Sequence, residues 1–218
     1  MIYKRILKRG LFLVSVFLVP ALGASADAGI APNTDFKKIY NRSTIISSRV
    51  TSYKDSGNNT WITMFADTHV TTDIPLARLR YIITDYLNYP RYFKRNTSSR
   101  IAGTTEDGGV YQDVRVTVGL LGLSFSGRYT VLVREMVDTP EKFVLTFNHI
   151  NDDGNIRDVN GEWYFERVTV DGQLMTYVRY VSSSSSLRRI GIQKAIQTMF
   201  VSAEFTDMTD QLLAAGAR

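Results

Sequence analysis

Two consecutive segments of this 218-residue chain alternate between apolar and polar residues: Val110–Leu120, VYQDVRVTVGL, and Ser124–Met136, SFSGRYTVLVREM. Successive side chains of a β-strand point to opposite faces of the sheet, so this alternation predicts two strands, each with one dry and one wet face. The connection through Leu121 and Gly122 is too short for a crossover. We therefore expect the two strands to form an antiparallel hairpin.

The same period of two continues on both sides of this hairpin. Further strands are expected over Ser99–Thr105, Lys142–Ile150, Glu162–Val170 and Gln173–Ser183, all joined by short turn-forming connections that indicate an antiparallel meander. One parity forms the dry face: Val114, Val116, Val118, Phe125, Tyr129, Val131, Val133, Phe143, Leu145, Phe147, Trp163 and Phe165. The opposite parity carries Asp113, Arg115, Arg128, Arg134, Glu162 and Glu166, and is expected to face water.

A hairpin and a short helix are expected before the meander. Ile45–Tyr53 and Trp61–Val70 are expected to be strands, and the turn residues Lys54–Asn59 lie between them. A helix then starts near Pro75, with apolar residues at helical spacing, and is expected to end at Asn88 and Pro90.

A long helix is expected at the C-terminal end. The five serines Ser182–Ser186 suggest a linker, after which Leu187–Leu213 has an apolar stripe that includes Ile192, Ile196 and Met199. This helix is expected to cover the dry face of the sheet, which otherwise exposes a large apolar patch. The predicted fold class is α+β: a curved antiparallel sheet of about seven or eight strands wrapped around the long C-terminal helix.

The N-terminal residues have the pattern of an export signal. Lys4, Arg5, Lys8 and Arg9 precede the charge-free apolar run Leu11–Leu22, and Ala24-Ser25-Ala26 then offers a cleavage site before Asp27. The apolar run is shorter than the roughly 20 residues of a bilayer span. An uncleaved anchor is the alternative. The expected organisation is a signal peptide over 1–26, a lead-in over 27–44 and one domain over 45–218.

Charge and cysteine content limit where such a protein works. The net charge of +5 arises from 26 basic and 21 acidic residues, and the chain has no cysteine. Without the leader, which has four cations and no acid, 22 basic and 21 acidic residues remain. A nucleic-acid partner therefore loses its electrostatic basis. A cysteine-linked lipoprotein is excluded, and a periplasmic or secreted protein is expected.

Three local motifs carry a family resemblance. Ile83–Phe93 reads ITDYLNYPRYF, Gly161–Phe165 reads GEWYF, and the turn Asp171-Gly172 leads into Thr176–Val178. In this order and spacing they resemble the START/SRPBCC superfamily, in its polyketide-cyclase and coenzyme-Q-binding-like branch. The resemblance covers about Asn59 to Ala215. It implies the helix-grip fold, with a cavity between the sheet and the last helix for an apolar or amphipathic molecule.

The resemblance makes the dry face a candidate binding site. A cavity of this kind typically has about 300–1,000 Å³. Arg188 and Arg189, expected at the start of the last helix, are candidate head-group contacts. The expected cavity residues are Phe125, Tyr129, Val131, Phe143, Phe147, Trp163, Phe165, Tyr180, Ile192, Ile196 and Met199.

The function expected is binding of a lipid, sterol-like or isoprenoid compound by an exported soluble protein, for sequestration or transport. A monomer is expected, with transient contact to a membrane or envelope proteins. No catalytic residue, cofactor or metal is expected, since His69 and His149 have no ligand-type neighbours at suitable spacing. One alternative is a cyclase or aromatase-type enzyme, which needs an ionisable group pointing inward. Another is an envelope interaction module whose aromatic residues fill a solid core.

Overall fold

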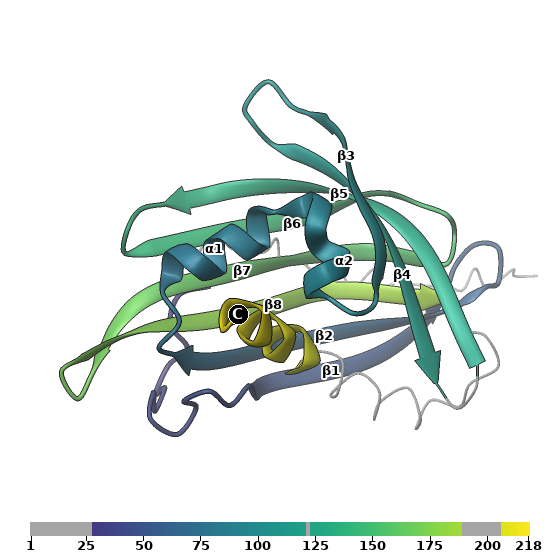
Figure 1. The fold of residues 1–218 in the computed structure, drawn as a ribbon. Coiled ribbons are helices and arrows are strands. Elements are labelled where there is room, and N and C mark those ends of the chain that lie inside the picture. Colours follow the sequence, from purple (N-terminus) through teal and green to yellow (C-terminus); the bar gives the residue numbers. More distant parts are fainter. Residues whose placement is uncertain (1–27, 121–122, 189–205) are drawn as a thin grey trace, which may run out of the picture.

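Eight strands form a single antiparallel sheet in the computed structural model, which describes residues 28–120, 123–188 and 206–218 (Figure 1). Their order across the sheet is β1-β2-β8-β7-β6-β5-β4-β3, so the last strand lies between the second and the seventh. The predicted antiparallel sheet is confirmed. The strands are β1 (Thr44–Lys54), β2 (Thr60–Thr72), β3 (Asn96–Thr104), β4 (Val110–Leu120), β5 (Leu123–Asp138), β6 (Lys142–Asp152), β7 (Ile156–Val170) and β8 (Gln173–Arg188).

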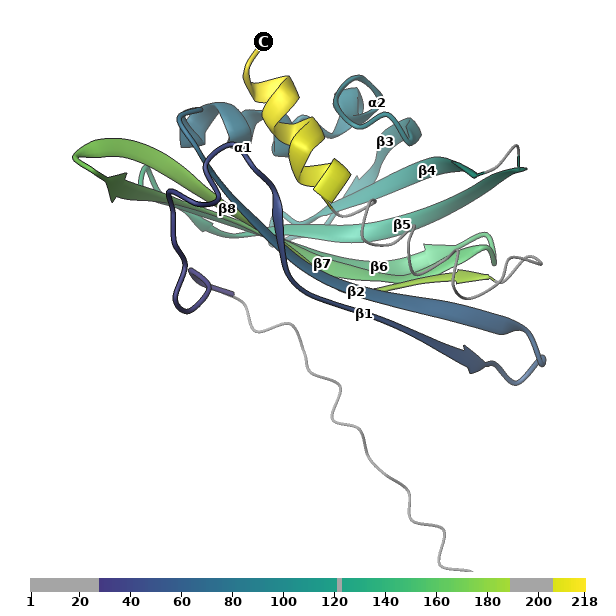
Figure 2. The same ribbon diagram turned by 90° about the horizontal axis from the view of Figure 1, so that it is seen from below.

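The helices lie together on the concave face of the sheet (Figures 1 and 2). They are α1 (Leu76–Thr84), the 3₁₀ turn η1 (Tyr86–Asn88), α2 (Tyr89–Tyr92) and a C-terminal helix over residues 206–216. Pro90 does not end the helical segment as predicted. It occupies the first turn of α2, where its missing N–H has no partner to lose.

The five serines that suggested a linker belong to β8. Ser182, Ser185 and Ser186 pair with β2, and Ser182, Ser184 and Ser186 pair with β7. Ser186 shares a hydrogen bond of 2.8 Å with Thr63, and Ser184 donates to the carbonyl oxygen of Asp158 at 2.8 Å. Serine has a low preference for strands, but the ladders to β2 and β7 and these hydroxyl hydrogen bonds hold the serines in strand geometry. The helix predicted from Leu187 was therefore placed too early, and residues 189–205 lie outside the described part of the chain.

The concave face carries the main core, as the alternation predicted. Phe143, Leu145, Trp163, Phe165 and Val178 are at most 4% exposed. They pack in one cluster with residues of the helices: Leu76, Leu79, Ile82, Ile83, Tyr86, Phe93, Leu212 and Ala215. The helices therefore cover the apolar face of the sheet, which would otherwise be exposed to water.

The opposite face is not uniformly wet, contrary to the prediction. Tyr164 and Tyr177 are buried there, and they form a second cluster with Ile39 and Phe36 of the N-terminal lead-in. The lead-in also bonds to the sheet, since Asn41 donates to the carbonyl oxygen of Thr71 at 2.7 Å. Residues 28–41 thus form a strap across the convex face of β2, β7 and β8.

A buried charged cluster fastens the first residues of this strap. Arg179 makes a bidentate pair with Asp67, through Nε at 2.9 Å and Nη2 at 2.7 Å, and both side chains are largely buried. Nη1 of Arg179 donates to the carbonyl oxygens of Ala28 and Gly29. The Ala28 N–H in turn donates to Oε1 of Glu162 at 2.9 Å. The hydrogen bonds to Asp67 raise the pKa of Arg179 against the lowering effect of burial, so the guanidinium remains charged.

His69 makes the stability of this face sensitive to pH. The side chain lies in β2, 9% exposed, with Nδ1 3.4 Å from the Tyr177 hydroxyl. Burial lowers the pKa of His69, while Asp67 raises it and Arg179 lowers it. The folded protein therefore favours the neutral ring, and the unfolded chain binds more protons as pH falls below about 6.5.

We expect Tm to fall as the pH is lowered from about 7 to 5, and His69→Gln to reduce this dependence of Tm on pH. Thermal unfolding at several pH values measures the dependence. His149→Gln is the control, because it removes the other histidine and leaves His69 in place. Equal slopes for the wild type and His69→Gln would contradict the assignment.

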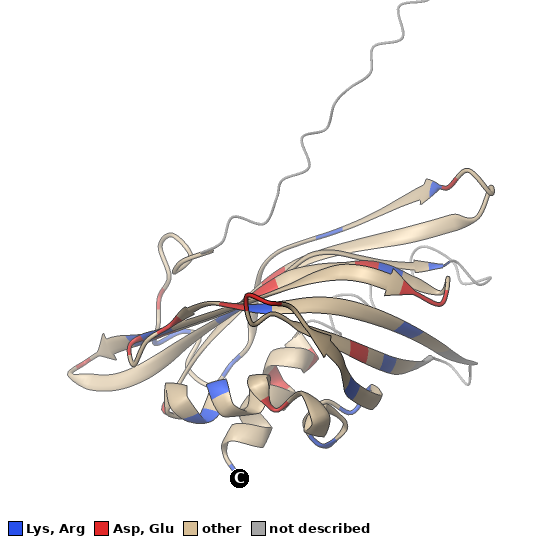
Figure 3. Ribbon diagram, turned by 90° about the horizontal axis from the view of Figure 1, so that it is seen from above, with Lys and Arg blue, Asp and Glu red and all other residues tan. Residues whose placement is uncertain are grey.

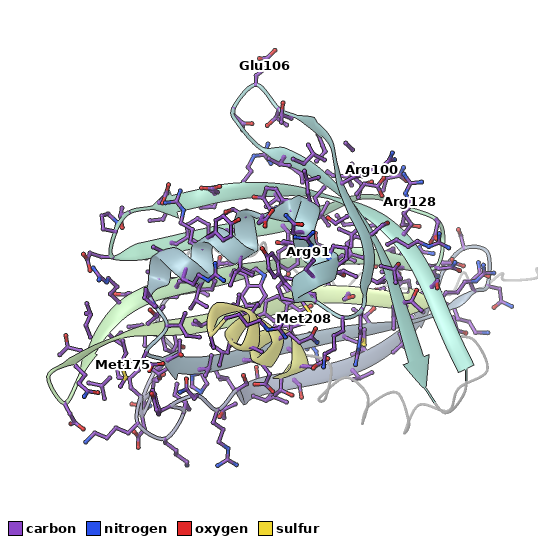
Figure 4. All side chains as sticks on the ribbon, in the orientation of Figure 1. Arg91, Arg100, Glu106, Arg128, Met175 and Met208 are labelled. Carbon is purple, nitrogen blue, oxygen red and sulfur yellow. The ribbon has the colours of Figure 1, made fainter. Side chains whose placement is uncertain are left out.

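Charges on the sheet occur in local pairs of opposite sign, and basic and acidic residues are interspersed along the strands (Figure 3). Asp113 of β4 is 4% exposed and accepts hydrogen bonds from Arg128 at 2.7 Å and Arg100 at 2.8 Å (Figure 4). The bonds from Arg128, then those from Arg100, lower the pKa of Asp113. Within the described residues, no helix has the length and apolar content to cross a membrane.

Gly161 of β7 lies where no side chain fits. A Cβ atom there would lie 2.2 Å from the carbonyl oxygen of Val181 and 2.4 Å from Cζ of Phe147. Because one of these atoms is backbone in a central strand, Gly161→Ala is expected to cost about 2–3 kcal/mol of unfolding free energy. Denaturant unfolding measures the loss.

Gly103 of β3 supplies the matched control. A Cβ atom there meets only Cδ2 of Tyr111, at 3.7 Å. Gly103→Ala is therefore expected to be neutral or to stabilise by up to about 1 kcal/mol, as alanine does in a strand that has room for it. Similar losses in both variants would contradict the packing at Gly161.

Candidate functional site: an aromatic cavity

A cavity of about 160 Å³ lies between the concave face of the sheet and the helices. Aromatic rings form much of its wall. Trp163 packs against Tyr180 with ring centroids 4.3 Å apart, and Phe147 stacks on Tyr180 at 6.2 Å. Aliphatic and thioether side chains extend this wall: Met64, Val114, Val116, Val131, Val133, Leu145, Ile156, Val159, Leu187 and Met208.

The structure brings five of the predicted cavity residues together. Tyr129, Val131, Phe147, Trp163 and Tyr180 all line the cavity, and they come from four adjacent strands of the meander. This grouping follows from antiparallel register, which places one parity of every strand on the same face.

Other predicted residues do not line it. Phe143 and Phe165 point to the same face but are fully buried in the neighbouring core, with ring centroids 5.8 Å apart. Arg188 ends β8, is exposed, and donates to Oδ1 of Asn59 at 2.7 Å. The remaining predicted positions lie outside the described residues or side chains: Phe125, Arg189, Ile192, Ile196 and Met199.

The sequence analysis missed a polar group of residues in the wall. Arg95, Asn96, Gln112 and Gln211 line the cavity, as does Met208, on the C-terminal helix in Figure 4. Gln112 has the same parity as Val114 on β4, so its side chain faces the cavity. This parity could have predicted Gln112 as a lining residue. Arg95 and Asn96 lie where α2 turns into β3, and no periodic pattern indicates the direction of a turn residue.

The phenols in the wall act as neutral polar groups. Burial raises the pKa of Tyr129 to about 12, and it also raises the pKa of Tyr180 and Tyr89. The Tyr89 hydroxyl donates to the carbonyl oxygen of Ile83 at 2.7 Å, which fixes that ring. At neutral pH these groups keep their protons, so they are hydrogen-bond donors and poor proton acceptors.

Neither histidine contributes to the cavity wall. His149 lies in β6, where Nε2 is 3.1 Å from Oδ2 of Asp152, and His69 lies on the convex face. Within the described part of the chain, no carboxylate lines the cavity and no group of three His, Asp or Glu side chains could hold a metal ion. The described wall therefore offers binding groups and no recognisable general base.

Polar contacts between described residues join the C-terminal helix to the turn and helix beside the cavity. The Lys94 N–H donates to Oε1 of Gln211 at 2.6 Å, and Nη2 of Arg95 lies 3.8 Å from Oδ2 of Asp207. Arg78 of α1 donates to the carbonyl oxygen of Ala215 at 3.4 Å. Besides these polar contacts, Leu212 and Ala215 of the helix are buried in the main core cluster.

The cavity between the described residues is smaller than the range expected from the sequence. Its volume is about half of the lower limit typical for ligand sites. The rings of Phe147, Trp163 and Tyr180 take up the space between sheet and helices. A cavity remains beside these rings among the described residues.

Comparison with solved structures identifies the fold, whereas no family model and no curated protein matches the sequence. Human StAR-related lipid transfer protein 5 superposes with a TM-score of 0.56 at 8% identity, over 77% of this chain and 86% of that chain. Human STARD10 has a TM-score of 0.52 at 7% identity, over 78% of this chain and 73% of that chain. A START superfamily protein from Mycobacterium smegmatis has a TM-score of 0.47 at 14% identity, over 68% and 93%.

At these identities the likeness concerns the fold alone. In this chain the fold is a curved antiparallel sheet with helices on its concave face, and the chain ends in one of these helices. The chain therefore has the START helix-grip fold, as its local motifs predicted.

Proposed function

We propose that this protein binds a hydrophobic small molecule, a lipid, sterol-like or isoprenoid compound, between the sheet and the C-terminal helix, and that it sequesters or carries this molecule. The observation that supports the proposal is a cavity lined by aromatic and aliphatic side chains inside a fully formed core. Its fold is shared with proteins named for lipid transfer.

The energy available from such a cavity is sufficient for binding. Removing about 200–300 Å² of apolar ligand surface from water yields roughly 5–7 kcal/mol before the costs of association. That corresponds to micromolar or weaker affinity. Since the cavity between the described residues is small, a larger ligand requires the C-terminal helix to move away from Lys94 and Arg95, which contact Gln211 and Asp207.

Solvent extraction tests the proposal. The purified protein is extracted with organic solvent, and the extract is analysed by mass spectrometry beside an extract of a mock purification. We expect a hydrophobic compound that is absent from the mock sample, and binding of N-phenyl-1-naphthylamine, an uncharged fluorescent probe of apolar sites. An empty protein that also fails to bind the probe would sink the proposal.

We also propose that the chain works outside the cytoplasm. The proposal rests on the basic, apolar and small-residue pattern of residues 1–26. In bacterial cells that express the full chain, we expect the protein in the periplasmic fraction, with Asp27 as its first residue. Retention of residues 1–26 on a cytoplasmic protein is the contradicting result.

A further inference from the structure

One charged side chain lines the described part of the cavity. Arg95 follows Phe93 and Lys94 in the turn between α2 and β3. Its backbone is fixed, because its carbonyl oxygen accepts a hydrogen bond of 2.9 Å from the Thr117 N–H and the preceding Phe93 is 1% exposed. Arg95 therefore starts from a fixed backbone position in a described wall that is otherwise uncharged.

The surroundings of Arg95 favour a negative partner. Asn96, Gln112 and Gln211, which also line the cavity, are neutral amides, and no carboxylate is among the described lining residues. Asp207 of the C-terminal helix is an acid close to the guanidinium, at 3.8 Å, and does not itself line the cavity. Burial lowers the pKa of Arg95 while Asp207 raises it, and a guanidinium stays charged after such shifts.

The contact with Asp207 can give way to a better acceptor. At 3.8 Å it is an ion pair without hydrogen-bond geometry, and both side chains are partly exposed, 26% for Arg95 and 38% for Asp207. A charge-assisted hydrogen bond to a carboxylate or phosphate oxygen is about 2.7–2.9 Å long and roughly twice as strong as a neutral one. An oxyanion that reaches Arg95 from the cavity would therefore bind more strongly than Asp207 does.

We infer that the ligand is an amphiphile with one anionic head group, a carboxylate or a phosphate monoester, whose head binds Arg95 and whose tail lies against Trp163 and Phe147. The inference rests on the proposed function and narrows it, since sterols and neutral isoprenoids carry no such charge. The Tyr129 hydroxyl, protonated at neutral pH, is a second donor in the same wall.

Three ligands with the same twelve-carbon tail test the inference. Dodecanoate, monododecyl phosphate and 1-dodecanol are each used, below their aggregation concentrations, to displace N-phenyl-1-naphthylamine from the wild-type protein. We expect at least one anion to displace the probe at about a tenfold lower concentration than dodecanol, which is the effect of one hydrogen bond to a charged group. The more effective anion identifies the head group as carboxylate or phosphate.

Variants test whether Arg95 causes the preference for the anionic ligands over dodecanol. Arg95→Met is expected to remove this preference, and Arg95→Lys to keep part of it. Asp207→Asn is expected to increase the preference by removing a competing carboxylate. Arg91→Met is the matched control, because Arg91 is exposed on α2 and does not line the cavity (Figure 4). Circular dichroism checks that each variant is folded. If Arg95→Met does not fold, Arg95→Lys and Asp207→Asn carry the test.

The outcomes separate the inference from the proposed function. Failure of the wild type to bind the probe or any of the three ligands refutes both. Binding of dodecanol as tightly as both anions refutes the anionic head group and leaves the hydrophobic cavity in place. A preference that persists unchanged in Arg95→Met, or that Asp207→Asn does not increase, refutes the role of Arg95.

Discussion

Arg179→Met is expected to lower the free energy of unfolding by about 3–5 kcal/mol, one of the two largest effects among the substitutions considered. The substitution leaves the Asp67 carboxylate buried without the bidentate partner that compensates its desolvation. It also removes the donors to the carbonyl oxygens of Ala28 and Gly29, so the strap loses two of its hydrogen bonds to the sheet. Chemical denaturation followed by circular dichroism measures the loss.

Two controls test the physical reason. Asp67→Leu combined with Arg179→Met should cost less than Arg179→Met alone, because no buried charge is left without a partner. Arg80→Met breaks an ion pair with Asp138 whose side chains are 40% and 39% exposed, and should cost less than about 1 kcal/mol. A loss of only that size in Arg179→Met would show that the convex-face cluster does not hold the strap.

Trp163→Ala is expected to cost about 3–5 kcal/mol and also to weaken ligand binding. Trp163 is 4% exposed, packs on Tyr180 and Phe165, and lines the cavity. Its removal deletes both core contacts and ligand-facing surface. Unfolding experiments give the first effect, and titration with N-phenyl-1-naphthylamine at a temperature where the variant is folded gives the second.

Phe165→Ala separates the two effects. Phe165 lies two residues further along the same strand, is fully buried, and does not line the cavity. We expect a similar loss of stability with little change in probe affinity. Equal losses of probe affinity in the two variants would indicate that the affinity depends on the stability of the fold and not on contacts with the cavity wall.

Strand positions in the meander were predictable because one parity is apolar along each strand. Val114, Tyr129 and Trp163 lie on the concave side, as the alternation requires. Their neighbours Tyr164 and Tyr177 are also large and apolar, which is typical of strands buried on both faces. The cover on the convex side was missed because the strap has no regular period that predicts which residues it buries.

The predicted serine linker and the missed Arg95 also depend on contacts between segments that are distant in the sequence. The run Ser182–Ser186 has turn-like composition, but its place between β2 and β7 decides its conformation. Position in a sheet is a property of topology, which local propensity does not contain. In the same way Arg95 became a wall residue only through the meeting of the α2–β3 turn with the C-terminal helix, from segments far apart in sequence.

The indole N–H signals of the two tryptophans test the central claim most directly. Trp163 lines the cavity, whereas the Trp61 indole donates to Asp55 at 2.9 Å and packs against Arg157, away from the cavity. With ¹⁵N-labelled protein, Trp61→Phe assigns the two signals. On titration with N-phenyl-1-naphthylamine we predict a saturable shift of the Trp163 signal while the Trp61 signal stays in place. Two unchanged signals at saturating probe, or a shift of Trp61 alone, would contradict a hydrophobic ligand site between the sheet and the C-terminal helix.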